Sequence, residues 1–195
     1  NKWAPFPEEM NRRLTGAMTD VHFAPTATAK ANLLREGVSA DAIHVTGNTV
    51  IDALLAVVDK LRADVELRQR LDKEFSFLDP SRRLILVTGH RRENFGEGFQ
   101  NICHALADIA SAHPDVQVLY PVHLNPNVRQ PVHDILAARQ LGNVHLIDPV
   151  DYLPFVYLMD RAHLIITDSG GVQEEAPSLG KPVLVVANKL DNAAQ

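Results

Sequence analysis

From residue 84 onward, short apolar segments alternate with segments whose apolar residues recur at helical spacing. Such alternation predicts parallel βαβ units, in which helices cover both faces of a sheet. We therefore expect an α/β fold with a Rossmann-type parallel sheet in residues 84–186. The predicted strands are 84–87, 116–120, 144–147, 164–167 and 183–186. Two helices are predicted at about 128–138 and at 152–161. A further helix is predicted to carry on its apolar face Phe99, Ile102, Cys103, Leu106 and Ala110.

The first eighty residues are organised differently. Two short strands are predicted at 21–25 and 43–46, with a helix between them. Two strands are too few for a sheet with its own core, so residues 1–55 are expected to be the remnant of a second Rossmann-type domain. Residues 56–83 are interpreted as interdomain helices that end in a hinge at 79–83, where proline and charged residues interrupt the apolar pattern.

A sharp turn follows the strand at 164–167 and contains Asp168, Ser169, Gly170 and Gly171. A glycine pair at a strand-to-helix turn lets a ligand approach the backbone, and the first amides of the helix point outward without internal partners. This arrangement suits a phosphate or a pyrophosphate. Glu175 lies one helical turn further on, where it could accept hydrogen bonds from sugar hydroxyls. An ordinary strand–loop–helix joint is the alternative.

A second turn of this kind follows the strand at 84–87. Gly89 ends the strand, and His90, Arg91 and Arg92 come next. Cationic donors at the carboxyl end of a strand lie where open α/β sheets bind ligands. The turn is not a P-loop, because no Gly-Lys-Ser/Thr follows its glycines. The alternative is that the two arginines are solvated and that His90 only caps the turn. Because both turns follow parallel strands, we expect them to share one edge of the sheet and one site.

Composition excludes several classes of function. The net charge is −5 and no basic run exceeds two residues, which argues against nucleic acid as a partner. No apolar run approaches the roughly 18 residues that span a bilayer, and no signal peptide is visible, so we expect a cytoplasmic protein without a membrane association. The nine histidines do not fall in a metal-binding spacing. We expect no metal and no cofactor, and a single core thiol at Cys103.

Seven strings along the chain together resemble the bacterial non-hydrolysing UDP-N-acetylglucosamine 2-epimerases, nearest to the enterobacterial type. They are PFPEEMNR (5–12), HFAPT (22–26), TGNTVIDAL (46–54), GHRRENFGEGF (89–99), YPVHLNPNVR (120–129), LIDPVDYLPF (146–155) and TDSGGVQEEAPSLGKPVL (167–184). The resemblance implies the two-domain glycosyltransferase-B architecture, with UDP held mainly by the carboxyl-terminal domain. It also implies a homodimer at full length.

The resemblance further implies the interconversion of UDP-GlcNAc and UDP-ManNAc for bacterial cell-surface polysaccharide synthesis, by elimination and re-addition of UDP. Elimination requires carboxylate acid–base groups near the sugar and stabilisation of the departing diphosphate. The residues that match the family's site residues are Glu8, Arg12 and His90 for catalysis, His90, Ser169, Gly170 and Gly171 for the diphosphate, Glu175 for the ribose, Val150 and Phe155 for the uracil, and His123 for a second, regulatory UDP-GlcNAc. A turn histidine is the alternative for His123.

The chain departs from the family in two places. The family chain is far longer, and the half that precedes these strings, with an arginine and two acidic residues of the site, has no counterpart here. Residues 187–195 form an atypical tail, in which Asn192 stands where the family has a phosphate-binding arginine. We therefore expect a chain truncated at both ends. Two alternatives to the epimerase stay open, a UDP-sugar-binding module without catalysis and another glycosyltransferase-B enzyme.

Overall fold

The computed structural model describes residues 6–89, 91 and 95–186 and divides the chain into two compact units. The first unit is Asn1–Ala53 and the second is Leu54–Gln195. The predicted tail at 187–195 and the predicted catalytic residue His90 lie outside the described residues. Each unit is described by itself.

The first unit has a parallel pair of short strands and little core. Residues His22, Phe23 and Ala24 pair with Ile43, His44 and Val45. Its elements are α1 (Glu8–Ala17), β1 (His22–Ala24), α2 (Ala27–Arg35), η1 (Ala40–Ala42), β2 (Ile43–Val45) and the first residues of α3 (Thr49–Ala63). Among its described apolar side chains, Ala24 and Ile43 are buried. The predicted strands and the helix between them are confirmed.

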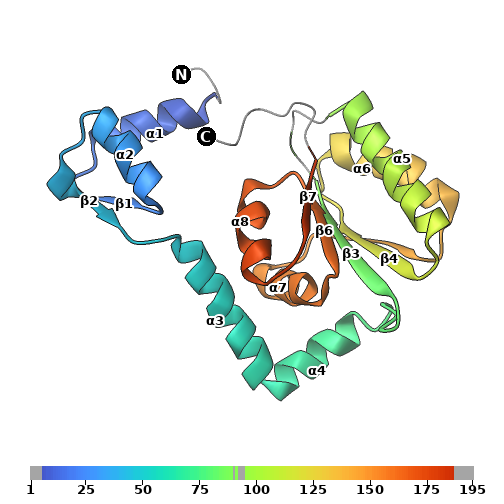
Figure 1. Ribbon diagram of the computed structural model, residues 1–195. Coiled ribbons are helices and arrows are strands. Elements are labelled where there is room, and N and C mark those ends of the chain that lie inside the picture. The colour runs from blue at the N-terminus through green and yellow to red at the C-terminus, as the bar shows by residue number, and fades with distance from the viewer. Residues whose placement is uncertain (1–5, 90, 92–94, 187–195) are drawn as a thin grey trace. The chain divides into compact units, whose positions relative to one another are not determined.

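The second unit is built on a five-stranded parallel sheet with the strand order β5-β4-β3-β6-β7 (Figure 1). Its further elements are α4 (Val65–Glu74), β3 (Arg83–Thr88), α5 (Glu97–Ala112), β4 (Val116–Pro121), α6 (Pro126–Ile135), η3 (Ala137–Arg139), β5 (Val144–Ile147), α7 (Tyr152–Arg161), β6 (Leu164–Thr167), α8 (Gly170–Ser178) and β7 (Val183–Val185). The predicted α/β fold with a parallel sheet is confirmed.

The sheet separates two apolar clusters, because successive side chains of a strand point to opposite faces. In β3, Leu84 and Leu86 pack with side chains from α3, α4, α7 and α8. Ile85 and Val87 pack with α5 and α6 on the other face. Figure 1 shows α5 and α6 on one side of the sheet and α7 and α8 on the other. Cys103 belongs to the second cluster, where burial raises the pKa of its thiol to about 12, as expected for a core thiol.

Capping residues explain where the observed helices differ from the predicted ones. The helix predicted at 128–138 begins at Pro126, because the Asn125 side chain accepts a hydrogen bond from the backbone N–H of Asn127 at 3.0 Å. It ends at Ile135 and is followed by the short 3₁₀ turn η3. Asp64 separates α3 from α4, since its side chain accepts from the N–H of Leu67 at 2.9 Å.

The division between the units falls inside α3, and the hinge at 79–83 stays a prediction. Hydrogen bonds hold the segment 79–83 within the second unit. The buried Gln117 side chain accepts from the N–H of Asp79 at 2.9 Å and donates to its carbonyl oxygen at 2.7 Å. Apolar residues of α3 and α4 also join the core of this unit. Sequence composition alone did not reveal these tertiary contacts. The assignment of either unit to a family domain stays a prediction.

Candidate functional site

The strand order creates a switch point between β3 and β6. The chain adds β4 and β5 on one side of β3 and then returns to add β6 and β7 on the other side. In open parallel sheets, ligands bind outside the carboxyl ends of the strands at such a point. The two turns predicted to share a site follow β3 and β6, so the structure places them at the same edge.

A pocket of about 210 Å³ lies at this edge of the sheet. Its lining comes from the loops after β3, β4, β5 and β6 and from the first turns of α7 and α8. The lining residues are Thr88, Gly89, Pro121, His123, Pro149, Val150, Phe155, Ser169 and Val172. The structure therefore brings together four residues that the sequence singled out, namely His123, Val150, Phe155 and Ser169.

The turn after β6 leaves the start of α8 open. Ser169 is the N-cap residue, and its N–H donates to the Thr167 hydroxyl at 2.9 Å. The Ser169 side chain makes no capping hydrogen bond to α8, and the first amides of a helix have no partner within it. A Cβ on Gly171 would meet Ser169 Oγ at 3.9 Å, an ordinary contact. The packing of the protein therefore does not require glycine at 171, which is the position where an incoming anion would approach the backbone.

Buried side chains contact the described residues Gly89 and Arg91 of the turn after β3. The Tyr120 hydroxyl donates to the carbonyl oxygen of Gly89 at 2.8 Å, and a Cβ on Gly89 would lie 3.2 Å from that hydroxyl. The Asp168 carboxylate, which is 4% exposed, accepts from the N–H of Arg91 at 2.8 Å. Burial, with smaller effects from Cys103 and Asp168, raises the pKa of Tyr120 well above its usual range. Tyr120 is therefore a neutral donor.

Arg91 supplies a positive charge at the open turn. Its side chain is exposed, and its Nη2 atom lies 3.3 Å from the place that a Cβ on Gly170 would occupy. The guanidinium group thus lies against the N-terminus of α8, where the helix dipole already favours an anion. Arg91 was noted in the sequence as a cation of this turn, but it was not assigned as a ligand.

Apolar side chains form part of the pocket lining. Val150 and Phe155 are half-buried and Val172 is buried, and all three line the pocket. A hydrophobic wall beside a group of convergent polar donors is the usual composition of a small-molecule site. It suits a flat ring attached to an anionic group.

Glu175 lies one helical turn beyond Val172 on α8, at the margin of the pocket. Its carboxylate is 7% exposed, and its Oε1 accepts from the Tyr152 hydroxyl at 3.0 Å. Burial and this hydrogen bond raise the pKa of Tyr152 to about 12, so Tyr152 stays a neutral donor at physiological pH. The sequence singled out Glu175 and missed Tyr152. The spacing between Tyr152 and Phe155 could have identified Tyr152, because residues three apart on a helix share one face.

His123 fits the interpretation as a turn histidine, and its contact with a second, regulatory UDP-GlcNAc stays a prediction. It lines the pocket, and its Nδ1 accepts from the N–H of Asn125 at 3.1 Å, which makes it a turn histidine as well. An accepting Nδ1 leaves the proton of the neutral ring on Nε2. The ring can therefore donate a hydrogen bond through Nε2.

Glu8 and Arg12 belong to the first unit, whereas the residues that line the pocket belong to the second unit. Glu8 is exposed in the first turn of α1. Arg12 contacts two carboxylates, with Nη2 at 2.9 Å from Glu9 Oε1 and at 2.8 Å from Glu36 Oε1. Hydrogen bonds from Arg12 and then Arg13 lower the pKa of Glu9 to about 2. Arg12 joins α1 to the end of α2, and its catalytic role stays a prediction.

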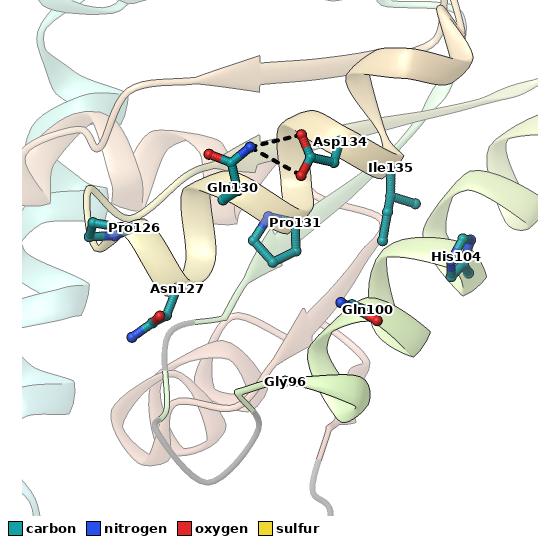
Figure 2. A pocket seen from close by; sticks show the side chains of 9 residues that line it. All are labelled: Gly96, Gln100, His104, Pro126, Asn127, Gln130, Pro131, Asp134 and Ile135. Carbon is teal, nitrogen blue, oxygen red and sulfur yellow. Dashed lines mark hydrogen bonds between the residues drawn. The ribbon is translucent and has the colours of Figure 1, made fainter.

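A larger pocket of about 500 Å³ lies elsewhere, between α5 and α6 (Figure 2). It contains none of the residues that the sequence singled out. Two of its polar side chains already hydrogen-bond to each other, since the Gln130 side chain donates to the Asp134 carboxylate at 2.9 Å (Figure 2). The smaller pocket at the switch point is the better candidate, because it combines an open helix N-terminus, a cation and an apolar wall.

Two negative findings hold for the described part of the chain. No group of three or more His, Cys, Asp or Glu residues there could hold a metal ion. No described helix is both long enough and apolar enough to cross a membrane.

Comparison with known proteins gives one consistent family. The sequence profile of the family described as UDP-N-acetylglucosamine 2-epimerase matches residues 1–192. A probable UDP-N-acetylglucosamine 2-epimerase from Ralstonia nicotianae is 61% identical over 186 residues, which are 95% of this chain and 49% of the relative. The UDP-N-acetylglucosamine 2-epimerase from Escherichia coli K12 is 61% identical over 184 residues, 94% of this chain and 48% of the relative.

A solved structure agrees with the sequence comparisons. The crystal structure of UDP-GlcNAc 2-epimerase from Neisseria meningitidis, bound to UDP-GlcNAc, has a TM-score of 0.89 at 50% identity and covers 97% of this chain. This chain covers 50% of that structure. The chain thus spans about half the length of the relatives it matches.

Proposed function

The chain belongs to the UDP-N-acetylglucosamine 2-epimerase family, and on this premise we propose that it forms the UDP-binding part of an enzyme that interconverts UDP-GlcNAc and UDP-ManNAc. The observation that carries the proposal is the pocket at the β3–β6 switch point. There the Arg91 guanidinium lies beside the open N-terminus of α8, and apolar side chains line the same pocket.

The chemistry of UDP fits the three parts of this pocket. The diphosphate would bind the amides of Ser169, Gly170 and Gly171, where backbone donors and the helix dipole favour negative charge. The uracil would lie against Val150 and Phe155. Because the Val150 side chain has no hydrogen-bonding group, any polar contact of this residue would come from its backbone. The ribose hydroxyls would then fall near the next turn of α8.

Elimination of UDP requires a stabilised leaving group and proton transfer at the sugar. The turn at the start of α8 would stabilise the departing diphosphate in the proposed enzyme. Glu8 would act as an acid–base carboxylate, with Arg12 holding the same helix, and His90 would donate to the diphosphate. These three roles rest on the family motifs, since His90 lies outside the described residues and the other two belong to the first unit.

We further propose that residues 1–55 are part of a larger Rossmann-like domain, followed by interdomain helices and a hinge at 56–83 and by the nucleotide-binding domain at 84–186. The exposed apolar side chains of the first unit support this division. Met18, Phe23 and Leu14 are 82%, 70% and 60% exposed, which a complete domain would cover. A cytoplasmic homodimer that serves surface polysaccharide synthesis belongs to the same proposal.

A second candidate is a UDP-sugar-binding module without catalysis. It is favoured by one observation, namely that no Asp or Glu is among the described residues that line the pocket. In that case the pocket would bind UDP, and the chain alone would not turn over UDP-GlcNAc.

The test uses a protein of the relatives' full length that carries this chain, incubated with UDP-GlcNAc in deuterated water. NMR should show deuterium at carbon 2 and the formation of UDP-ManNAc. The Glu8→Gln variant should lower the rate by about 10² to 10⁴, the usual contribution of a general acid or base. Accumulation of free UDP would instead indicate a hydrolysing enzyme, and absence of deuterium at carbon 2 would contradict epimerisation.

A further inference from the structure

A hydrogen bond connects α7 and α8 at the margin of the candidate pocket. The Tyr152 hydroxyl donates to Oε1 of Glu175 at 3.0 Å. The two residues differ in exposure. Glu175 is 7% exposed, whereas Tyr152, the first residue of α7, is 44% exposed.

Helical spacing relates this hydrogen bond to the pocket. Tyr152 and Phe155 are three residues apart on α7, and Val172 and Glu175 are three apart on α8, so the members of each pair lie on one helix face. Phe155 and Val172 line the pocket. The Tyr152–Glu175 hydrogen bond therefore links the two helices that carry Phe155 and Val172, one helical turn along each from these residues.

Burying a carboxylate costs folding free energy unless hydrogen-bond donors contact it. A buried charge requires hydrogen bonds, and an ionised carboxylate offers about four acceptor positions on its two oxygens. Tyr152 occupies one position on Oε1. The remaining capacity can serve hydroxyl groups of a ligand, and fixing one oxygen restricts the directions in which the other positions point.

We propose that Tyr152 is a positioning residue, which orients the Glu175 carboxylate so that it accepts hydrogen bonds from the ribose hydroxyls of a bound nucleotide. This inference rests on the proposed function, because it takes the ribose to lie beside Glu175. Tyr152 would act through Glu175 and would not contact the reacting atoms.

The same helix offers a matched control. The Tyr157 hydroxyl donates to the Asp72 carboxylate of α4 and accepts from Arg161 at 2.9 Å. Tyr157 therefore makes a hydrogen bond of the same chemistry within the apolar cluster of α3, α4, α7 and α8, but with a partner other than Glu175. Tyr157→Phe therefore measures the effect of losing a tyrosine hydroxyl on α7 that does not contact Glu175.

The experiment is a titration of this chain with UDP and with 2′,3′-dideoxy-UDP, which lacks both ribose hydroxyls. Wild type should bind UDP more tightly than the dideoxy analogue. Tyr152→Phe should weaken UDP binding by about three- to tenfold, the usual effect of one hydrogen bond, and leave the affinity for the analogue unchanged. Tyr157→Phe should leave the UDP-to-analogue affinity ratio at its wild-type value.

The outcomes separate the inference from the proposed function. If wild type binds neither nucleotide, or binds both equally, the nucleotide site or the ribose position is wrong, and the inference falls with it. If wild type discriminates and Tyr152→Phe discriminates equally well, the proposed function stands and the role of Tyr152 is overturned. Equal weakening of both ligands by Tyr152→Phe would mean a purely structural role and would also overturn the inference.

Discussion

The two turns at the carboxyl edge of the sheet each contain a glycine after a parallel strand, but the two glycines differ in packing. After β3, the space around Gly89 is filled by the Tyr120 hydroxyl at 3.2 Å and the Phe99 ring at 3.6 Å from a Cβ position. After β6, a Cβ on Gly171 would meet only the Ser169 hydroxyl, at 3.9 Å. Glycine at 89 therefore serves the fold, whereas glycine at 171 leaves backbone open to a ligand.

The same substitution at both turns should give the largest contrast in stability. Gly89→Ala forces the buried Tyr120 hydroxyl, 3.2 Å from the new Cβ, to move, and overpacking of this kind costs about 1–3 kcal/mol of unfolding free energy. Gly171→Ala places a methyl group in ordinary contact and should be neutral or slightly stabilising. Thermal unfolding of the two variants beside wild type measures the contrast. Equal melting temperatures for the two variants would refute the distinction between the turns.

Removal of the Tyr120 hydroxyl should have a smaller effect on stability. Tyr120→Phe deletes the hydrogen bond to the carbonyl oxygen of Gly89, which is worth about 1 kcal/mol. It also removes the oxygen nearest to a Cβ at position 89. In the Tyr120→Phe background, Gly89→Ala should therefore cost less than in wild type, and a double-mutant cycle measures the coupling. Additive costs would show that Tyr120 does not enforce the glycine.

Arg91 should contribute to anion binding and not to stability. Because its guanidinium is exposed, Arg91→Ala should weaken UDP binding by only about two- to fivefold, and the affinity of the variant should depend less on salt. Arg83, at the opposite end of β3 and paired with Asp115, is the matched control. Equal loss of affinity in Arg83→Ala and Arg91→Ala would mean that overall charge, and not the position of Arg91, governs binding.

The smallest expected effect concerns the pH dependence of Tyr152. Its pKa is raised to about 12 in the folded chain, above the ordinary value near 10. A group whose pKa is higher when folded favours folding fully below its unfolded value, and this contribution is lost as the pH rises from about 10 to 12. Ultraviolet titration of wild type minus Tyr152→Phe should show a phenol that ionises near pH 12. Ionisation near pH 10 would indicate that the hydrogen bond to Glu175 is absent in solution.

The sequence predicted elements well where hydrophobic periodicity alone determines them. The predicted limits of β5, α7 and β6 agree with the structure residue for residue. The limits of α6 differ, because the Asn125 cap and the following Pro126 set its start. The hinge at 79–83 stays a prediction. Composition does not record the contact between Asp79 and Gln117, which joins residues 38 positions apart.

The candidate site could be predicted in part. Two turns at one sheet edge follow from the parallel βαβ order, and the family resemblance pointed to Val150, Phe155, Ser169 and His123, which line one pocket. The sequence did not predict that Tyr120 contacts Gly89, that Asp168 contacts Arg91, or that Tyr152 donates to Glu175. These pairings depend on side chains from different helices and strands, whose proximity only the fold establishes.

The account rests on the claim that the start of α8 is an open diphosphate site, and a UDP titration of wild type and Gly171→Val followed by amide NMR tests it most directly. In wild type, UDP should shift the amide signals from Ser169 to Val172. Gly171→Val should keep the melting temperature within a few degrees and lose at least tenfold in affinity, about 1.4 kcal/mol, because its side chain blocks approach to the backbone. Undiminished UDP binding by a folded Gly171→Val variant would contradict the account.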